Sequence, residues 1–269
     1  MHGDHRRRAW TYTGSKVPEV TAWFWIVKIL TTAMGEAVSD WSVKTIDPYL
    51  AVAIGFVAFA AAIVVQFSVR RYLTWVYWTT VSMVAIFGTM VADSLHVGLG
   101  IPYIVTAPSF FAAVLIVFAF GYRVEGTLSI HSIVTPRREF FYWATVCATF
   151  ALGTATGDLT AATFHLGYLG SGFMFLLLIA IPALAYRLGF NAVASFWIAY
   201  ILTRPVGASF ADYFGFPRLS GGMGFGHGMV SLVTAVLVAG FVTYLAVTRT
   251  GVPSSSDAVP SPSSPSRVH

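Results

Sequence analysis

The stretch FWIVKILTTAMGEAVSD, residues 24–40, contains a spacing that the chain uses four times. In it a tryptophan is followed ten residues later by a glycine, and that glycine is followed five residues later by an aspartate. The four copies are Trp25–Gly35–Asp40, Trp78–Gly88–Asp93, Trp143–Gly153–Asp158 and Trp197–Gly207–Asp212. Identical spacings at four places in one chain predict an internal structural repeat.

The composition predicts a membrane protein. Of the 269 residues, 57% are hydrophobic and 10% are charged, whereas a soluble domain carries about 25% charged residues. The formal net charge is +5, but the lysines and arginines flank apolar runs, which favours membrane orientation over nucleic-acid binding. With a single cysteine, Cys147, the chain has no intrachain disulfide.

Eight apolar segments of about 20 residues each are long enough to span a bilayer. Each repeat is then a hairpin of one signature helix, which carries the tryptophan–glycine–aspartate spacing, and one plainer helix. The predicted fold is an all-α integral membrane protein: eight transmembrane helices as four parallel two-helix repeats, pseudo-symmetric about an axis along the membrane normal. The predicted limits are 19–40, 49–69, 73–96, 102–122, 140–163, 167–187, 192–213 and 224–247.

The positive charges predict the orientation. Most lysines and arginines outside the spans fall on the side of the termini, and Lys44 and Arg218 fall on the other, so both termini are expected in the cytoplasm. We expect a basic mobile tail over 1–18, repeats one and two over 19–122, a cytoplasmic linker over 123–139, repeats three and four over 140–247, and a disordered Pro- and Ser-rich tail over 248–269. The aromatic clusters that open the signature helices are expected to anchor at the cytoplasmic interface.

The four Trp-x9-Gly-x4-Asp units resemble a bacterial membrane-protein family that is built of four tandem repeats, each with two transmembrane segments and a characteristic tryptophan. The resemblance covers about residues 19–247. It implies the fold and a bacterial inner (plasma) membrane location. The family's function is unknown, so the resemblance implies no activity and no site residues.

On a helix, the glycine, the small residue four positions later and the aspartate share one face. Small residues allow close helix approach, so we expect the four signature helices to pack centrally, with the plainer helices outside. Charges within a bilayer cost at least about 2.5–3.5 kcal/mol each and need partners or water. The predicted ion-binding carboxylates are Glu36, Asp40, Asp93, Asp158 and Asp212, with Lys28 and Arg204 as counter-charges. The alternative is structural salt bridging, for example between Arg204 and one of the aspartates.

Three histidines, His96, His165 and His227, are candidate metal ligands, because Asp, Glu and His together suit Mn, Fe, Co, Ni or Zn. Histidines that are hydrogen-bonded for structural reasons are the alternative. The glycine-rich run 220–228 lacks the strand and the Gly-Lys-Ser/Thr of a phosphate loop, and close packing or a break in the last helix explains it better. Pro205 is expected to kink the seventh helix.

These features favour a secondary transporter of a small cation, with protons as the coupling ion. A passive pore with a ring of four aspartates, an intramembrane enzyme or haem protein, and a structural scaffold without ligand are the alternatives. No enzyme and no cofactor is predicted. The expected partners are a small cation or proton and the lipid bilayer, with no nucleic acid; a homo-oligomer remains open.

Overall fold

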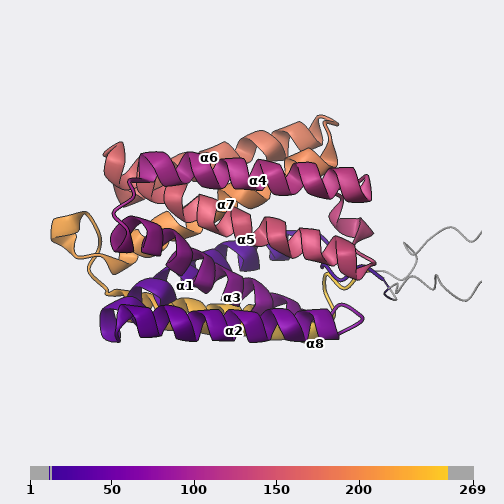
Figure 1. Ribbon diagram of the computed structural model, residues 1–269, viewed down its shortest axis with the longest axis horizontal. Helices are drawn as coiled ribbons and strands as arrows, with labels where there is room; N and C mark the ends of the chain where they lie inside the picture. The colour runs from indigo at the N-terminus through magenta and orange to yellow at the C-terminus, as the bar shows by residue number, and fades with distance from the viewer. Residues whose placement is uncertain (1–11, 13, 254–269) are drawn as a thin grey trace, which may run out of the picture.

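The computed structural model describes Tyr12 and residues 14–253, and the predicted tails at 1–11 and 254–269 lie outside these residues. Within the described part the chain is all-helical, as predicted, with eight α-helices and no β-strand (Figure 1). The helices are α1 Ala22–Thr45, α2 Pro48–Ser68, α3 Thr74–Asp93, α4 Tyr103–Glu125, α5 Pro136–Asp158, α6 Gly167–Arg187, α7 Ala192–Gly215 and α8 His227–Thr248. Short π-helical turns, η1 Ser94–Gly98 and η3 Leu159–Thr163, extend α3 and α5.

The four signature helices form the centre of the bundle, as predicted. They are α1, α3, α5 and α7, here called the inner helices, and they contact one another in the cyclic order α1–α3–α5–α7–α1. The outer helices α2, α4, α6 and α8 pack mainly on α3, α5, α7 and α1 respectively. Each outer helix therefore covers the inner helix of the next repeat, and the two helices of one repeat make only minor contacts. The hairpin predicted for each repeat is not a packing unit.

The signature glycines bring the inner helices together. A Cβ atom at Gly35 would collide with Ala85, at Gly88 with Phe150, at Gly153 with Arg204 and at Gly207 with Thr32. In every case the residue met lies three positions before the signature glycine of the next repeat, and the fourth contact closes the series on the first repeat. The prediction of close approach at these glycines is confirmed.

Gly207→Ala is expected to destabilise the protein by about 1–3 kcal/mol, because overpacking a tight contact forces neighbouring groups to shift. The added Cβ would lie 2.8 Å from the backbone nitrogen of Ala33, which cannot rotate away as a side chain can. The midpoint of thermal unfolding in detergent measures the effect. Gly240→Ala on α8 is the control, since a Cβ there meets nothing within 4 Å; equal stability of the two variants would contradict the close contact.

Aromatic side chains fill the bundle at the beginning of the inner helices. Trp78, Trp143 and Trp197 are buried, with Tyr77, Tyr142 and Tyr200 beside them. The hydroxyls of Tyr77 and Tyr142 are 2.6 Å apart. Three of the four signature tryptophans therefore belong to the core, and their predicted role as interface anchors is wrong for these three. Trp25 is half-buried and packs against Phe24 and Phe196.

Tyr12 and residues 14–21, here called the N-terminal strap, lie across this end of the bundle. Lys16 Nζ is 2.6 Å from Glu139 Oε1 on α5 and donates to the Gln66 carbonyl on α2 at 2.6 Å. Tyr12 and Gln66 also donate to the Glu139 carboxylate. Burial lowers the pKa of the Lys16 amine, and its hydrogen bond to Glu139 acts in the opposite direction. Lys16 is 1% exposed, so its prediction as part of a mobile tail is wrong.

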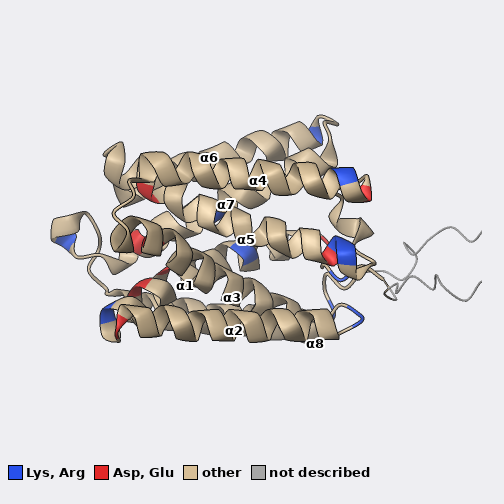
Figure 2. Ribbon diagram, in the orientation of Figure 1, with Lys and Arg blue, Asp and Glu red and all other residues tan. Residues whose placement is uncertain are grey.

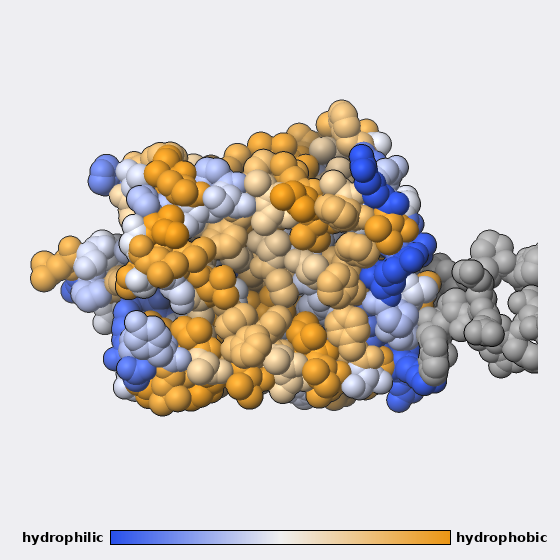
Figure 3. Space-filling view, viewed as in Figure 1, coloured by the Kyte–Doolittle hydropathy of each residue, from blue (hydrophilic) through white to orange (hydrophobic). Residues whose placement is uncertain are grey.

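The surface of the bundle is apolar around its middle. Figure 3 shows hydrophobic residues across the body and hydrophilic residues at the ends, and the outer helices expose large apolar side chains such as Phe56, Leu115, Leu177 and Leu232. Among the described residues, five helices are long and apolar enough to cross a membrane: α2, α3 with its π-turn, α4, α6 and α8. The remaining three are the inner helices α1, α5 and α7, whose polar residues largely face other helices.

Candidate functional site

Arg204 stands at the centre of the bundle and joins all four repeats. It is 1% exposed. Its Nη2 lies 2.7 Å from Glu36 Oε2 and 2.6 Å from Thr154 Oγ1, and it also contacts Thr89 Oγ1. Its Nη1 lies 3.4 Å from the Thr32 carbonyl. The predicted counter-charge thus has a buried carboxylate partner, but that partner is Glu36 and not one of the aspartates.

The three side chains that meet at Arg204 Nη2 occupy one position of the repeat. Glu36, Thr89 and Thr154 each follow the signature glycine of their own helix, while α7 supplies the arginine three residues before its glycine. The Gly-Thr pair of the second and third repeats was visible in the sequence, but its role was not. The signal for this contact is the residue after each of these glycines, together with Arg204, the one basic residue of α7.

Lys28, the second predicted counter-charge, has no ion-pair partner among the described residues. Its Nζ is buried without a hydrogen bond and lies 4.0 Å from the centre of the Phe150 ring and 4.2 Å from that of Tyr200. Cation–π contacts of this kind stabilise a desolvated ammonium by about 2 kcal/mol or more. Lys28 and Arg204, the two buried basic side chains of the inner helices, separate the aromatic end of the bundle from its acidic end.

The aspartates of the four repeats lie one helical turn beyond the Arg204 layer. Asp40 and Asp212 lie within α1 and α7, whereas Asp93 and Asp158 are the last α-helical residues before the π-turns η1 and η3. Such π-turns occur frequently at functional sites. Figure 2 shows most of the other lysines and arginines at the opposite end of the bundle.

The described residues contain two groups of three potential ligand atoms. Within each group the three atoms all lie within 4.8 Å of one another, and both groups contain Asp40. One comprises Glu36, Asp40 and Asp93; the other comprises Asp40, Asp212 and His227. Asp158 belongs to neither group. It occupies the equivalent place on α5, one turn beyond Thr154, whose hydroxyl contacts Arg204. We call these five carboxylates and His227 the acid cluster.

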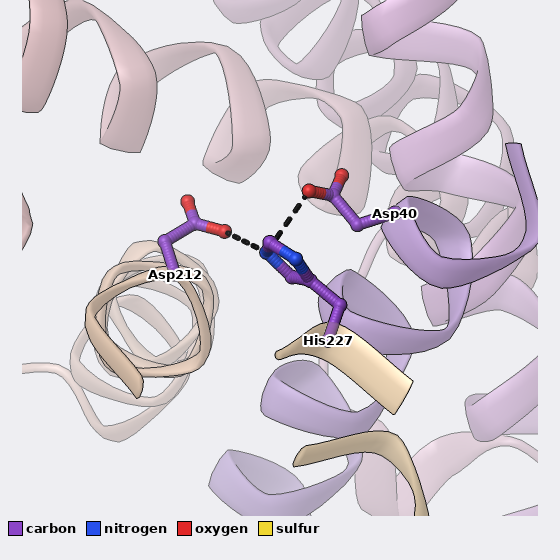
Figure 4. A group of neighbouring side chains, drawn as sticks. All are labelled: Asp40, Asp212 and His227. Atoms are coloured by element: carbon purple, nitrogen blue, oxygen red, sulfur yellow. Dashed lines mark ion pairs between the residues drawn. The ribbon is translucent and has the colours of Figure 1, made fainter. Parts of the chain in front are cut away.

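His227 points its Nε2 between two of the aspartates (Figure 4). Nε2 is 3.0 Å from Asp40 Oδ2 and 3.8 Å from Asp212 Oδ1. The imidazole is 7% exposed, and its Nε2 has no hydrogen-bond partner. The 3.0 Å distance thus brings two atoms together without the alignment that a hydrogen bond requires. A buried ring nitrogen and two carboxylates in this arrangement offer nitrogen and oxygen ligands to a transition-metal ion.

The glycine-rich run explains how His227 reaches the cluster. Gly226 has φ +81°, a conformation that favours glycine, and α8 begins at the next residue. A Cβ atom at Gly215 would lie 2.6 Å from the imidazole, so the end of α7 leaves the space that the ring fills. The Phe216 ring then meets the imidazole at 87° with 4.7 Å between centroids. The run begins a helix and positions a histidine.

The other two candidate histidines are not among these groups. His96 Nδ1 is 2.9 Å from the Ile101 carbonyl, and its ring stacks on Tyr103 with 3.7 Å between centroids. His165 is exposed and has φ +57°. Both therefore have the environment of residues in a helix connection. Of the three histidines, the structure brings only His227 to the predicted carboxylates.

Four segments of the chain match one family model, described as "Repeat of Unknown Function (DUF347)", at residues 23–72, 76–127, 141–188 and 195–250. Each match covers one signature helix and the outer helix that follows it, which agrees with the four repeats predicted from the tryptophan spacing. No match was found among curated proteins or among solved structures.

Proposed function

The chain belongs to the DUF347 repeat family, and from this premise we propose that it is a multi-pass membrane protein which carries a small divalent cation across the bilayer, with protons as the coupling ion. The description of the family states no activity. All eight helices would span the membrane as four parallel repeats around an axis along the membrane normal. The cyclic order of the inner helices and the apolar outer surface support this arrangement.

The orientation that we propose places both termini in the cytoplasm of a bacterial cell. Lysines and arginines gather at the end of the bundle where the N-terminal strap and the start of α5 lie, among them Arg123, Arg137 and Arg138. This supports the orientation, because positively charged loops favour the cytoplasmic side. The acid cluster would then face the outside of the cell.

The observation that carries the proposal is the meeting of Asp40, Asp212 and His227. Their ligand atoms come from α1 of the first repeat and from α7 and α8 of the fourth, and His227 Nε2 is a buried nitrogen without a hydrogen bond. Asp40 is shared with the oxygen-only group of Glu36 and Asp93. A cation that moves from one group to the other would keep Asp40 as a ligand. The carboxylates that the cation leaves could then each bind a proton in its place.

A passive pore has less support than a carrier. On the other side of the acid cluster the axis is occupied by the Arg204 layer, by Lys28 and by the buried aromatic residues. A pore would need a continuous polar path, whereas a carrier is open to one side at a time. The half-buried Asp40, Asp93 and Asp158 fit a site that is accessible from the acidic end.

Asp40→Asn is expected to reduce uptake of Mn²⁺ or Zn²⁺ into proteoliposomes by tenfold or more, because it removes a charged ligand that both groups share. An acid-inside gradient should drive uptake of the wild type, and a pH dye in the lumen should report the counter-flow of protons. Asp47→Asn is the matched control: Asp47 caps α2, and asparagine caps equally well. Uptake that is the same in Asp40→Asn, His227→Gln and the control would reject the proposal.

A further inference from the structure

We infer that Lys44 is a tethered cation which occupies the mouth of the acid cluster and must be displaced before a metal ion binds. The inference rests on the proposed function and identifies a residue that sets its affinity and selectivity. Lys44 lies in the last turn of α1, one turn beyond Asp40, so its ammonium group is held beside the cluster by the helix itself.

The lysine contacts three different elements at this place. Its Nζ lies 2.6 Å from Asp40 Oδ2 on its own helix, 3.4 Å from His227 Nδ1 on α8, and 4.5 Å from the centre of the Phe216 ring, which ends α7. An ordinary surface ion pair between residues four apart on one helix would involve only the contact with Asp40. The ammonium thus touches the shared carboxylate and the imidazole of the group that contains Asp212.

Lys44 differs from Lys28 and Arg204, the two buried basic residues of the inner helices, because its ammonium group can move into water. Its side chain is 51% exposed, while that of Asp40 is 14% exposed. The ammonium can therefore turn into water, which the buried Arg204 guanidinium cannot do. The contact with His227 Nδ1 also opposes metal binding, because an imidazole that accepts a hydrogen bond at Nδ1 carries its proton on Nε2, the nitrogen that faces the aspartates.

A tethered group competes at an effective concentration that reaches the millimolar range or above for short links. Dissolved monovalent cations carry the same charge as Lys44 and have to compete with it from solution. A divalent ion gains twice the electrostatic attraction and can also coordinate the imidazole. The expected consequence is that Lys44 weakens the binding of every cation and discriminates most strongly against monovalent ones.

The test is calorimetric titration of Mn²⁺ into the full-length protein in detergent at 150 mM NaCl. Lys44→Gln is expected to bind Mn²⁺ about tenfold more tightly than the wild type, and its affinity should fall more steeply when NaCl is raised, because Na⁺ then competes. Lys44→Arg keeps the charge and should remain near the wild type. Arg218→Gln removes one positive charge from the exposed connection that follows α7, where the arginine donates to the Met223 carbonyl at 3.5 Å. It should change affinity less than twofold, since salt screens an exposed charge that makes no ion pair with the acid cluster.

The outcomes separate the two proposals. Equal affinities of Lys44→Gln and Arg218→Gln, or weaker binding by Lys44→Gln, would overturn the inference and leave the transport proposal standing. Binding by Lys44→Gln alone would support the inference in its strongest form. Both proposals would be overturned if neither the wild type nor any variant bound Mn²⁺, Zn²⁺ or Co²⁺ while thermal unfolding showed that the proteins were folded.

Discussion

Arg204→Ala is expected to destabilise the protein by about 3–5 kcal/mol, which is the usual result when one partner of a buried ion pair is removed. The Glu36 carboxylate would remain 3% exposed with only the Thr89 hydroxyl as its hydrogen-bond donor, 3.3 Å away. The guanidinium also contacts residues from all three of the other inner helices, so its loss weakens every contact of the central layer at once. Unfolding in detergent, followed by circular dichroism, measures the change.

The double variant Arg204→Met/Glu36→Gln is the control for this prediction. It removes both charges at nearly constant volume, and buried pairs replaced by uncharged groups are often neutral or better for stability. We expect most of the lost stability to return. A single Arg204→Ala variant within about 1 kcal/mol of the wild type would show that the pair does not hold the inner helices together; a double variant as unstable as the single one would point to lost packing of the arginine stem.

Lys16→Met should produce the second large effect, again about 3–5 kcal/mol, and it should also release the N-terminal strap. Glu139 would keep its bonds from Tyr12 and Gln66 but would lose the only charge that compensates it within the described contacts. Amide hydrogen exchange should therefore increase at Lys16 and Tyr12, whose backbone N–H groups donate to residues 133 and 134.

Two variants control for this second effect. Lys16→Met/Glu139→Leu should recover stability by removing both buried charges. Arg137→Ala breaks an ion pair with Glu125 at a side chain that is 67% exposed, and pairs at such positions contribute about 0–1 kcal/mol. Equal losses in Lys16→Met and Arg137→Ala would mean that the strap contact is an ordinary surface pair.

The arrangement of the inner helices could be predicted from the sequence because the same spacing occurs in all four repeats. The tryptophan–glycine–aspartate spacing located every inner helix and explained which face of each would meet its neighbours. The same reasoning could not reveal how the outer helices pack, since the connection within a repeat suggests a hairpin, while the contacts run to the following repeat. The predicted limit at Asp40 was also too early, because α1 continues to Thr45 and so presents Lys44.

The candidate site was predictable in its carboxylates and less so in its histidines. Asp40, Asp93 and Glu36 share a repeat face, and the structure brings them together; whether they bind an ion stays a prediction. His96, His165 and His227 looked alike as isolated residues near helix ends. What distinguishes His227 is the room left by Gly215 and the turn at Gly226, which depend on the tertiary contact of α7 with α8. Lys16 was missed because a lysine beside an arginine-rich tail gives no sign of burial.

The packing of α8 on α1 gives the polypeptide an almost circular organisation. The backbone N–H of Glu19 already donates to the Gly251 carbonyl at 2.9 Å, so the beginning and the end of the bundle lie side by side. No repeat is therefore a privileged starting point. A permuted gene that joined residue 251 through a linker to residue 12, so that Lys16 is kept, and opened the chain between α4 and α5 would encode the same set of helix neighbours, with the former third repeat as its first.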